Sequence, residues 1–106
     1  MSEATQVLTV FRNRLRPEHV DEYSTTGDRM NELARSMPGY VDHKTFTAAD
    51  GERVTIVTFE DAESQRAWRD LAEHRAAQQA GRDRFYAEYA IQGADVRYSH
   101  HWRHEG

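Results

Sequence analysis

The chain of 106 residues contains no cysteine, no long apolar run and no block of basic residues. Without cysteine it has no disulfide frame, no thiolate metal site and no cysteine nucleophile. A formal net charge of −4, with arginines spread along the whole sequence, lacks the electrostatic pattern of a protein that binds nucleic acid or an anionic membrane. We therefore expect no nucleic acid and no membrane among its partners.

Signals for export, hydrolysis and nucleotide binding are absent as well. The first residues, MSEATQ, combine neither a basic nor an apolar segment, so no secretion signal is predicted and a cytoplasmic location is expected. No serine stands in a nucleophile-elbow motif, and there is no phosphate-cradling glycine loop or dinucleotide fingerprint. A hydrolase and a nucleotide-dependent enzyme are therefore disfavoured.

The length fits one compact domain covering residues 1–106, with flexible ends expected at 1–5 and 103–106. Hydrophobic residues make up only 38% of the chain, and charged residues make up 30%. Because the apolar and aromatic residues are grouped in well-spaced runs, we expect a folded domain with a thin core rather than a disordered chain.

Local patterns in the first half predict one helix and three strands. Apolar and β-branched residues favour strands over 6–15, 40–47 and 53–59, and the pair Asp50 and Gly51 predicts a tight hairpin between the last two. Apolar residues three or four apart predict a helix that begins at Pro17 and ends before Pro38 and Gly39.

The second half is predicted to hold two helical segments and a final strand. Asp61 is a suitable N-cap for a helix that reaches Ala72. A further helical segment is predicted over 75–89, with Gly81 as a bend, and the last strand over 91–102. The order βαββ(αα)β predicts an α+β, ferredoxin-like fold, in which a four-stranded antiparallel sheet carries its helices on one face.

The other face of that sheet suggests a second copy of the chain. Within 53–59, Val54, Ile56 and Thr58 point to one side and Thr55, Val57 and Phe59 to the other, so both faces require burial. Two sheets packed face to face in a homodimer would provide it. The space between each sheet and its own helices is then the expected pocket.

Four stretches resemble one known family: VFRNRLRP, MPGYVDHKTF with its Asp-Gly hairpin, VTFEDAESQRAW and EHRAAQQAGRDRF. Together they are similar to the antibiotic biosynthesis monooxygenase (ABM) domains of the dimeric α+β barrel superfamily, over nearly the whole chain. That family includes cofactor-independent oxygenases of anthrone and quinol substrates and also haem-degrading enzymes. The resemblance implies a dimeric α+β barrel that binds a small aromatic substrate and dioxygen.

The haem-degrading branch shares two further residues with this chain. Its asparagine on the first strand matches Asn13, and its tryptophan on the helix after the third strand matches Trp68. At the place of its iron-ligating histidine stands Gln78, and the nearest imidazole is His74, one turn earlier. Because an amide is a poor iron ligand, the resemblance implies chemistry without a cofactor, with haem binding as the alternative.

These matches define the expected site. Asn13, Trp68 and His74 are the candidate catalytic residues, and Phe59, Leu71, Gln78 and Phe85 are the candidate substrate-binding residues, listed here as one set. Alternatives remain for each catalytic residue. Asn13 can be a hydrogen-bonded strand residue, Trp68 a core residue, and His74 a solvated histidine near a helix end.

Other histidines are expected to lie outside the site. His43 shares a strand face with Val41 and Thr45, and we expect it on the dimer interface or the sheet surface. His100, His101 and His104 suggest a metal site, but neighbouring strand residues point to opposite faces, so a solvated end is favoured and no metal is expected.

Two functions remain open on this reasoning. The first is a monooxygenase that oxidises an electron-rich aromatic compound of the anthrone, phenol or quinol type with dioxygen. The alternative is a haem-binding or haem-degrading protein, or a protein that binds a small aromatic compound without turnover.

Overall fold

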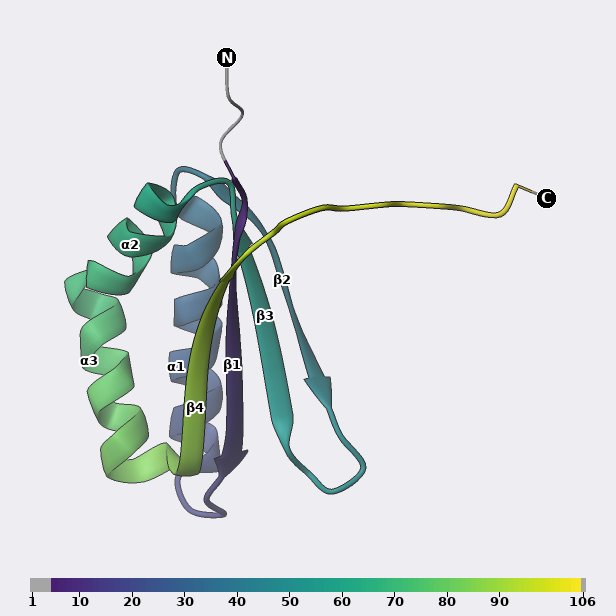
Figure 1. Cartoon of the computed structure of the whole chain (residues 1–106). Helices are drawn as coiled ribbons and strands as arrows, with labels where there is room; N and C mark the ends of the chain where they lie inside the picture. The colour runs from purple at the N-terminus through teal and green to yellow at the C-terminus, as the bar shows by residue number, and fades with distance from the viewer. Residues whose placement is uncertain (1–4, 106) are drawn as a thin grey trace.

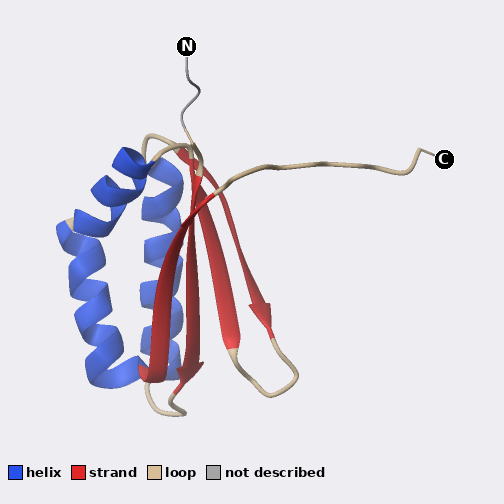
Figure 2. Cartoon of the chain, in the orientation of Figure 1, coloured by secondary structure: helices blue, strands red, loops and turns tan. Residues whose placement is uncertain are grey.

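The computed structural model describes residues 5–105, which form one antiparallel sheet with all helical segments on one side (Figures 1 and 2). The elements are β1 (Val7–Leu15), α1 (Val20–Ser36), β2 (Tyr40–Thr47), β3 (Arg53–Phe59), α2 (Ala62–Asp70), α3 (Ala72–Ala80), the π-helical turn η1 (Gly81–Phe85) and β4 (Tyr86–Asp95). The strand order is β2-β3-β1-β4. The predicted α+β, ferredoxin-like fold is confirmed.

The central strands β1 and β3 set the register of the sheet. Val7 lies opposite Phe59 and Asn13 lies opposite Arg53, while the other edge of β1 places Asn13 opposite Tyr89 of β4. The hairpin between β2 and β3 turns at Gly51, whose φ of 92° is a left-handed value that glycine adopts without strain. The predicted Asp50–Gly51 turn is confirmed.

Helix α1 begins three residues later than predicted. Pro17 and Glu18 lie in a turn, and His19, the N-cap, has a left-handed φ of 61° that interrupts any helix starting at Pro17. The first helical bond runs from the amide of Tyr23 to the carbonyl of His19, 2.9 Å away. The left-handed backbone of His19 therefore keeps Pro17 from the first helical position that proline favours.

The segment after α2 differs most from the sequence-based prediction. Only Leu71 separates α2 from α3, the helical region ends at Phe85 rather than Tyr89, and β4 starts at Tyr86. The cause is pairing with β1, which takes up Tyr86 opposite Leu15 and Tyr89 opposite Asn13. These long-range hydrogen bonds override the helical spacing of the aromatic residues.

The predicted strand over 91–102 is also too long. The ladder ends where Asp95 meets Val7, the first residue of β1, and a single further hydrogen bond runs from the amide of Val96 to the carbonyl of Gln6. Residues 96–105 have no helix or strand and extend away from the sheet (Figure 1). The expectation of flexible ends falls partly on residues 1–4 and 106, outside the described part of the chain.

The core lies between the helices and the sheet. Phe59, Trp68 and Ala34 form its centre, and partly buried apolar residues surround them, namely Met30, Leu33, Met37, Tyr40, Val57 and Leu71. Asp61 caps α2 as predicted, since its carboxylate accepts a hydrogen bond of 2.7 Å from the amide of Ser64. These contacts fix the helices against the sheet.

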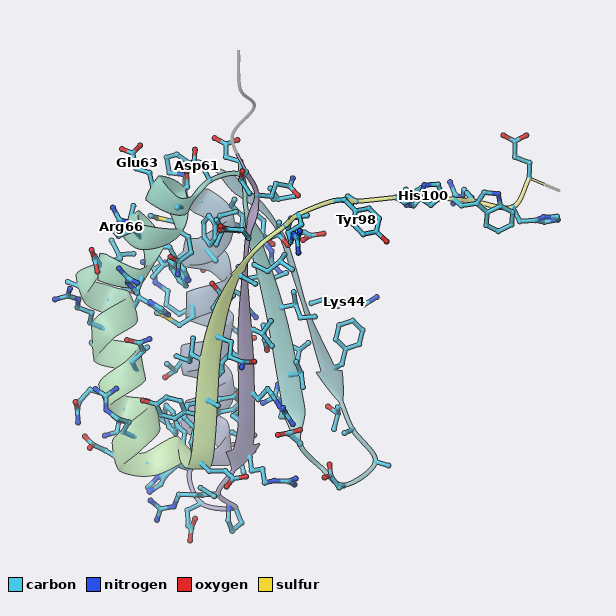
Figure 3. All side chains as sticks on the ribbon, viewed as in Figure 1. Lys44, Asp61, Glu63, Arg66, Tyr98 and His100 are labelled. Atoms are coloured by element: carbon cyan, nitrogen blue, oxygen red, sulfur yellow. The ribbon has the colours of Figure 1, made fainter. Side chains whose placement is uncertain are left out.

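No helix or strand among residues 5–105 covers the opposite face of the sheet. Lys44 projects from this face, away from the helices (Figure 3), and Phe46 beside it is 50% exposed. The residues beyond β4 add two more exposed aromatic side chains, Tyr98 and Trp102. Among the described residues, no helix has the length and apolar composition needed to cross a membrane.

Candidate active site

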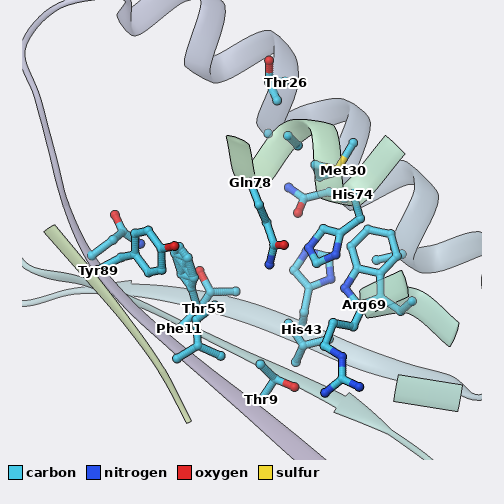
Figure 4. Close-up of a pocket in the computed structure, with 18 of the residues that line it drawn as sticks. Thr9, Phe11, Thr26, Met30, His43, Thr55, Arg69, His74, Gln78 and Tyr89 are labelled. Carbon is cyan, nitrogen blue, oxygen red and sulfur yellow. The ribbon is translucent and has the colours of Figure 1, made fainter. Parts of the chain in front are cut away.

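A pocket of about 220 Å³ lies between the sheet and the helices (Figure 4). Its floor comes from β1, β3, β2 and β4, and its walls from α1, α2, α3 and η1. The lining residues are Thr9, Phe11, Asn13, Tyr23, Thr26, Gly27, Met30, Asn31, Ala34, His43, Thr55, Val57, Gln65, Trp68, Arg69, His74, Ala77, Gln78, Phe85, Tyr86, Tyr89 and Ile91. The expected location of the pocket matches this arrangement.

One end of the pocket is aromatic. The ring of Phe11 stacks on Tyr89 with centroids 5.6 Å apart and packs against Tyr86 at 5.3 Å. Tyr23 and Phe85 meet edge to face at 5.6 Å. Such a set of rings favours a flat apolar ligand, because offset and edge-to-face contacts stabilise aromatic groups beyond simple burial.

The other end carries two imidazoles that point toward one another, His43 from β2 and His74 from α3 (Figure 4). The ring of His74 stacks on Trp68, with centroids 4.2 Å apart and an interplanar angle of 24°. The pKa of His74 is lowered, chiefly because burial disfavours the charged ring, although the carbonyls of Arg69 and Trp68 act in the opposite direction. His74 is therefore a neutral imidazole at neutral pH.

His43 occupies the pocket because of an irregularity in β2. The pairing with β3 shifts between Tyr40 and Asp42, so an extra residue, Val41, bulges out of the ladder. The bulge brings Tyr40 and His43 to the helix side, where the Tyr40 hydroxyl lies 2.6 Å from Nδ1 of His43. The expectation of an outward-facing His43 is wrong, because it assumed an uninterrupted alternation along the strand.

Asn13 is the one buried polar residue among those described, with 3% of its surface exposed. It lines the pocket on β1 between Arg53 and Tyr89, and its Oδ1 is buried without a hydrogen-bond partner in the described chain. An unpartnered buried amide is costly, and such groups are retained mainly where they serve a function.

Asn13 and the imidazoles lie at different ends of the pocket. His43 of β2 pairs with Val57 of β3, and Val57 pairs with Thr9 of β1. Asn13 lies four residues after Thr9 on β1. At roughly 3.4 Å per residue the two positions are about 13 Å apart along the strand. A single small ligand atom cannot touch both, so an elongated ligand is needed to use the full set of polar groups.

The structure brings together five of the seven predicted site residues. Asn13, Trp68, His74, Gln78 and Phe85 all line the pocket. Phe59, which is wholly buried, and Leu71 do not line it. They pack in the core cluster behind the pocket wall, where they support Trp68 rather than meet a ligand.

The sequence reasoning also missed Tyr23 and Tyr86, which line the pocket, and Arg53, which lies beside them. Arg53 donates a short hydrogen bond to the Tyr23 hydroxyl and lies over its ring, with the guanidinium carbon 5.2 Å from the ring centroid. Beside them, burial raises the pKa of Tyr86 well above its usual range. Tyr86 packs so closely on Gly81 that a Cβ there would lie 2.5 Å from its ring.

No metal site emerges from the described residues 5–105, in which no three histidine or acidic side chains cluster as ligands. His100, His101 and His104 lie on the extended C-terminal segment (His100 is labelled in Figure 3), outside any strand. The argument that assigned them to opposite strand faces therefore does not apply.

Comparisons with known proteins agree with this architecture. Residues 6–80 match the family model described as antibiotic biosynthesis monooxygenase. The chain is 31% identical over 87 residues to YqjZ of Bacillus subtilis (strain 168), an uncharacterized protein, covering 82% of this chain and 76% of that protein.

Solved structures share the fold at low sequence identity. One is SnoaB, a cofactor-independent oxygenase from Streptomyces nogalater, with a TM-score of 0.74, 18% identity, and coverage of 91% of this chain and 97% of that chain. Another is Rv0793 from Mycobacterium tuberculosis, with a TM-score of 0.77, 16% identity, and coverage of 89% and 97%. On the family match and the sequence relative, this chain belongs to the antibiotic biosynthesis monooxygenase family.

Proposed function

We propose that this protein is a monooxygenase that oxidises an electron-rich aromatic compound of the anthrone, phenol or quinol type with dioxygen, without a metal or an organic cofactor. The observation that carries the proposal is the pocket, which has aromatic walls at one end and, at the other, two imidazoles whose pKa values are both lowered. Family membership supports a monooxygenase-type role, and the low-identity likeness to SnoaB adds the shared fold.

The proposed chemistry draws its electrons from the substrate. A base removes a phenolic or benzylic proton, and the electron pair left on the aromatic anion reduces dioxygen. For an anthrone, the ring CH₂ becomes a carbonyl, one oxygen atom of O₂ enters the product and the other leaves as water. The protein supplies the base, stabilises the anion and keeps bulk water from the reacting atoms.

Each catalytic candidate has a defined part in this scheme. His74 is the proposed base, because its lowered pKa keeps it unprotonated and able to accept a proton. Trp68 stacks on His74 and orients it. The amide nitrogen of Asn13, at the aromatic end, is the proposed donor to a substrate oxygen, and its Oδ1, which has no partner in the described chain, is the proposed acceptor for a substrate hydroxyl.

We propose that haem is not the ligand of this pocket. Gln78, an amide, stands at the place of the family's iron ligand and lines the pocket. A cavity of about 220 Å³ is also below the roughly 300–1,000 Å³ of common ligand pockets, which favours a small, flat aromatic over a macrocycle. Haemin titration is then expected to give no stoichiometric Soret shift; a tight complex that is lost in His74→Ala would favour a haem-degrading enzyme.

The test of the oxygenase is oxygen uptake with a panel of anthrones and quinols, on protein treated with a chelator. Loss of one oxyanion donor typically costs on the order of a hundredfold in rate, so Asn13→Ala is expected to lower turnover by about that factor with little change in KM. His74→Ala is expected to lower turnover similarly, and Trp68→Phe less.

Matched controls lie outside the pocket. Gln6→Ala removes an exposed amide before β1, and His100→Ala removes an imidazole from the C-terminal segment, so both are expected to keep full activity. Uptake that none of the pocket substitutions changes would place the chemistry elsewhere. No uptake with any compound would leave a binding protein for small aromatics, in which Trp68→Ala weakens binding and Asn13→Ala has little effect.

A further inference from the structure

The hydrogen bond between Tyr40 and His43 depends on the bulge in β2 at Val41. In a regular strand, residues three apart point to opposite faces. The bulge at Val41 interrupts that alternation and brings the Tyr40 hydroxyl to 2.6 Å from Nδ1 of His43, with the two rings edge to face and their centroids 5.8 Å apart. Bulges of this kind commonly re-aim side chains beside active sites.

The protonation of the pair follows from the available partners. A neutral imidazole has one nitrogen that donates and one that accepts. Among residues 5–105, His43 Nδ1 is the only hydrogen-bond partner of the Tyr40 hydroxyl, and the His43 ring makes no other hydrogen bond. If Nδ1 carried the proton, the phenolic hydrogen would have no acceptor in this part of the chain. Donation from Tyr40 to Nδ1, with the imidazole proton on Nε2, is the arrangement that gives the phenolic hydrogen an acceptor within the described residues.

We propose that Tyr40 is a positioning residue that holds His43 in its Nε2–H tautomer, and that His43 donates this hydrogen as a hydrogen bond to an oxygen of an aromatic carbonyl or phenolate in the pocket. The chemical class of the ligand rests on the proposed function. The tautomer and the direction of the hydrogen bond rest on the geometry of β2 alone.

In this proposal the two imidazoles have different roles in hydrogen bonding. His43 and His74 face one another across the same end of the pocket (Figure 4). Partial burial and the positive charge of Arg35 lower the pKa of His43, against a smaller opposing effect of Asp42, so the ring is neutral at neutral pH. His74 acts as acceptor and His43 as donor, and a substrate oxygen that gains negative charge as its proton leaves would be stabilised by the His43 N–H.

The first test measures the tautomer directly, without substrate. Nitrogen-15 NMR of the labelled protein, with the His43 signals assigned by their loss in His43→Gln, is expected to show Nδ1 unprotonated and Nε2 protonated. Tyr40→Phe keeps the ring that packs in the core and removes only the hydroxyl, and is expected to give a mixture of the two tautomers. A protonated Nδ1 in the wild type, or a spectrum unchanged by Tyr40→Phe, would overturn the proposal.

The second test measures the donated hydrogen bond by binding. The probes are 1,4-naphthoquinone, which offers carbonyl acceptors, and naphthalene, which offers none. His43→Phe is expected to weaken quinone binding by roughly threefold to tenfold and to leave naphthalene binding unchanged, while His43→Gln retains part of the quinone affinity through its amide donor. His100→Phe is the control and is expected to change neither.

The outcomes separate this inference from the oxygenase proposal. An equal change for both probes in His43→Phe, or no quinone binding to the wild type, refutes the donor role of His43. Quinone binding that depends on His43, together with no oxygen uptake from any anthrone or quinol, refutes the oxygenase and keeps the donor.

Discussion

Both faces of the sheet carry apolar residues, but the two faces differ in how far these residues are buried. On the helix side, Phe59 is wholly buried and Asn13 is 3% exposed. On the other side, Val10 lies opposite Ile56, and both are only partly buried. The difference is the helical layer, which turns one apolar face into a core and a pocket. The other face has the apolar composition of an interface, and no helix or strand among the described residues covers it.

The uncovered face is the basis of the dimer prediction. Its centre is apolar, formed by Leu8, Val10, Val54 and Ile56, and its rim carries the ion pair of Arg12 with Glu52 at 2.7 Å. An apolar centre with a polar rim is typical of interfaces between copies of one chain. The homodimer remains a prediction.

The largest expected effect tests the covered face. Trp68→Ala empties a site in the core cluster and is expected to lower the free energy of unfolding by about 3–5 kcal/mol, because both burial and packing are lost. Trp102→Ala, at a residue that is 73% exposed, is the matched control and is expected to change stability by less than about 0.5 kcal/mol. Urea unfolding gives both values, and equal losses would contradict the assignment of the core.

A charge on the uncovered face tests the dimer. Ile56→Glu would place an unpaired carboxylate at the centre of the proposed interface and is expected to weaken self-association by about a hundredfold or more. Sedimentation at micromolar concentration should give twice the chain mass for the wild type and one chain mass for the variant. Val20→Glu, at an exposed residue off the sheet, is the control. A monomeric wild type would contradict the prediction that the chain dimerises through the uncovered face.

Gly27 offers a smaller test of the pocket side. It lies within α1, lines the pocket, and a Cβ there would meet no atom within 4 Å. Gly27→Ala is expected to stabilise the protein by about 0.5–1 kcal/mol, since alanine loses less backbone freedom in a helix. The added methyl group would narrow the pocket and weaken binding of 1,4-naphthoquinone. Thermal unfolding and titration measure the two effects, and a destabilised variant would show that the space is not free.

The smallest expected effect is a pH dependence that comes from His74. Its folded pKa lies below the unfolded value of about 6.5, so above that pH both states are neutral and His74 contributes no difference. As pH falls below about 6.5, the unfolded chain takes up the proton first, and stability decreases until the folded ring also titrates. The decrease is expected to be about 1 kcal/mol or less over one pH unit.

Urea midpoints at pH 7.5, 6.5 and 5.5 measure this effect. His74→Gln should reduce the slope, His43→Gln should remove the part that comes from the lowered pKa of His43, and His100→Gln should change neither. Carboxylates whose pKa is lowered by hydrogen bonds and charged partners, such as Asp50, Asp61 and Glu73, act below about pH 4 and do not interfere. A slope that His74→Gln leaves unchanged would indicate that the ring is solvated.

The sequence by itself determined the kinds of elements and most of their order. Asp50 with Gly51 specified the hairpin, and Asp61 specified the start of α2, because turns and caps depend on the preferences of a few adjacent residues. Asn13 and Trp68 were assigned to the pocket from the family resemblance and the positions of their elements, and both line it.

Only the tertiary structure decided where β4 begins and which way His43 points. Tyr86 joined the strand because β1 offered hydrogen-bonding partners, and His43 turned inward because β2 gained one residue against β3. Phe59 and Leu71 became core rather than site because the helices pack directly over them. Register and packing depend on contacts between segments far apart in the sequence, and local periodicity contains no information on a single inserted residue.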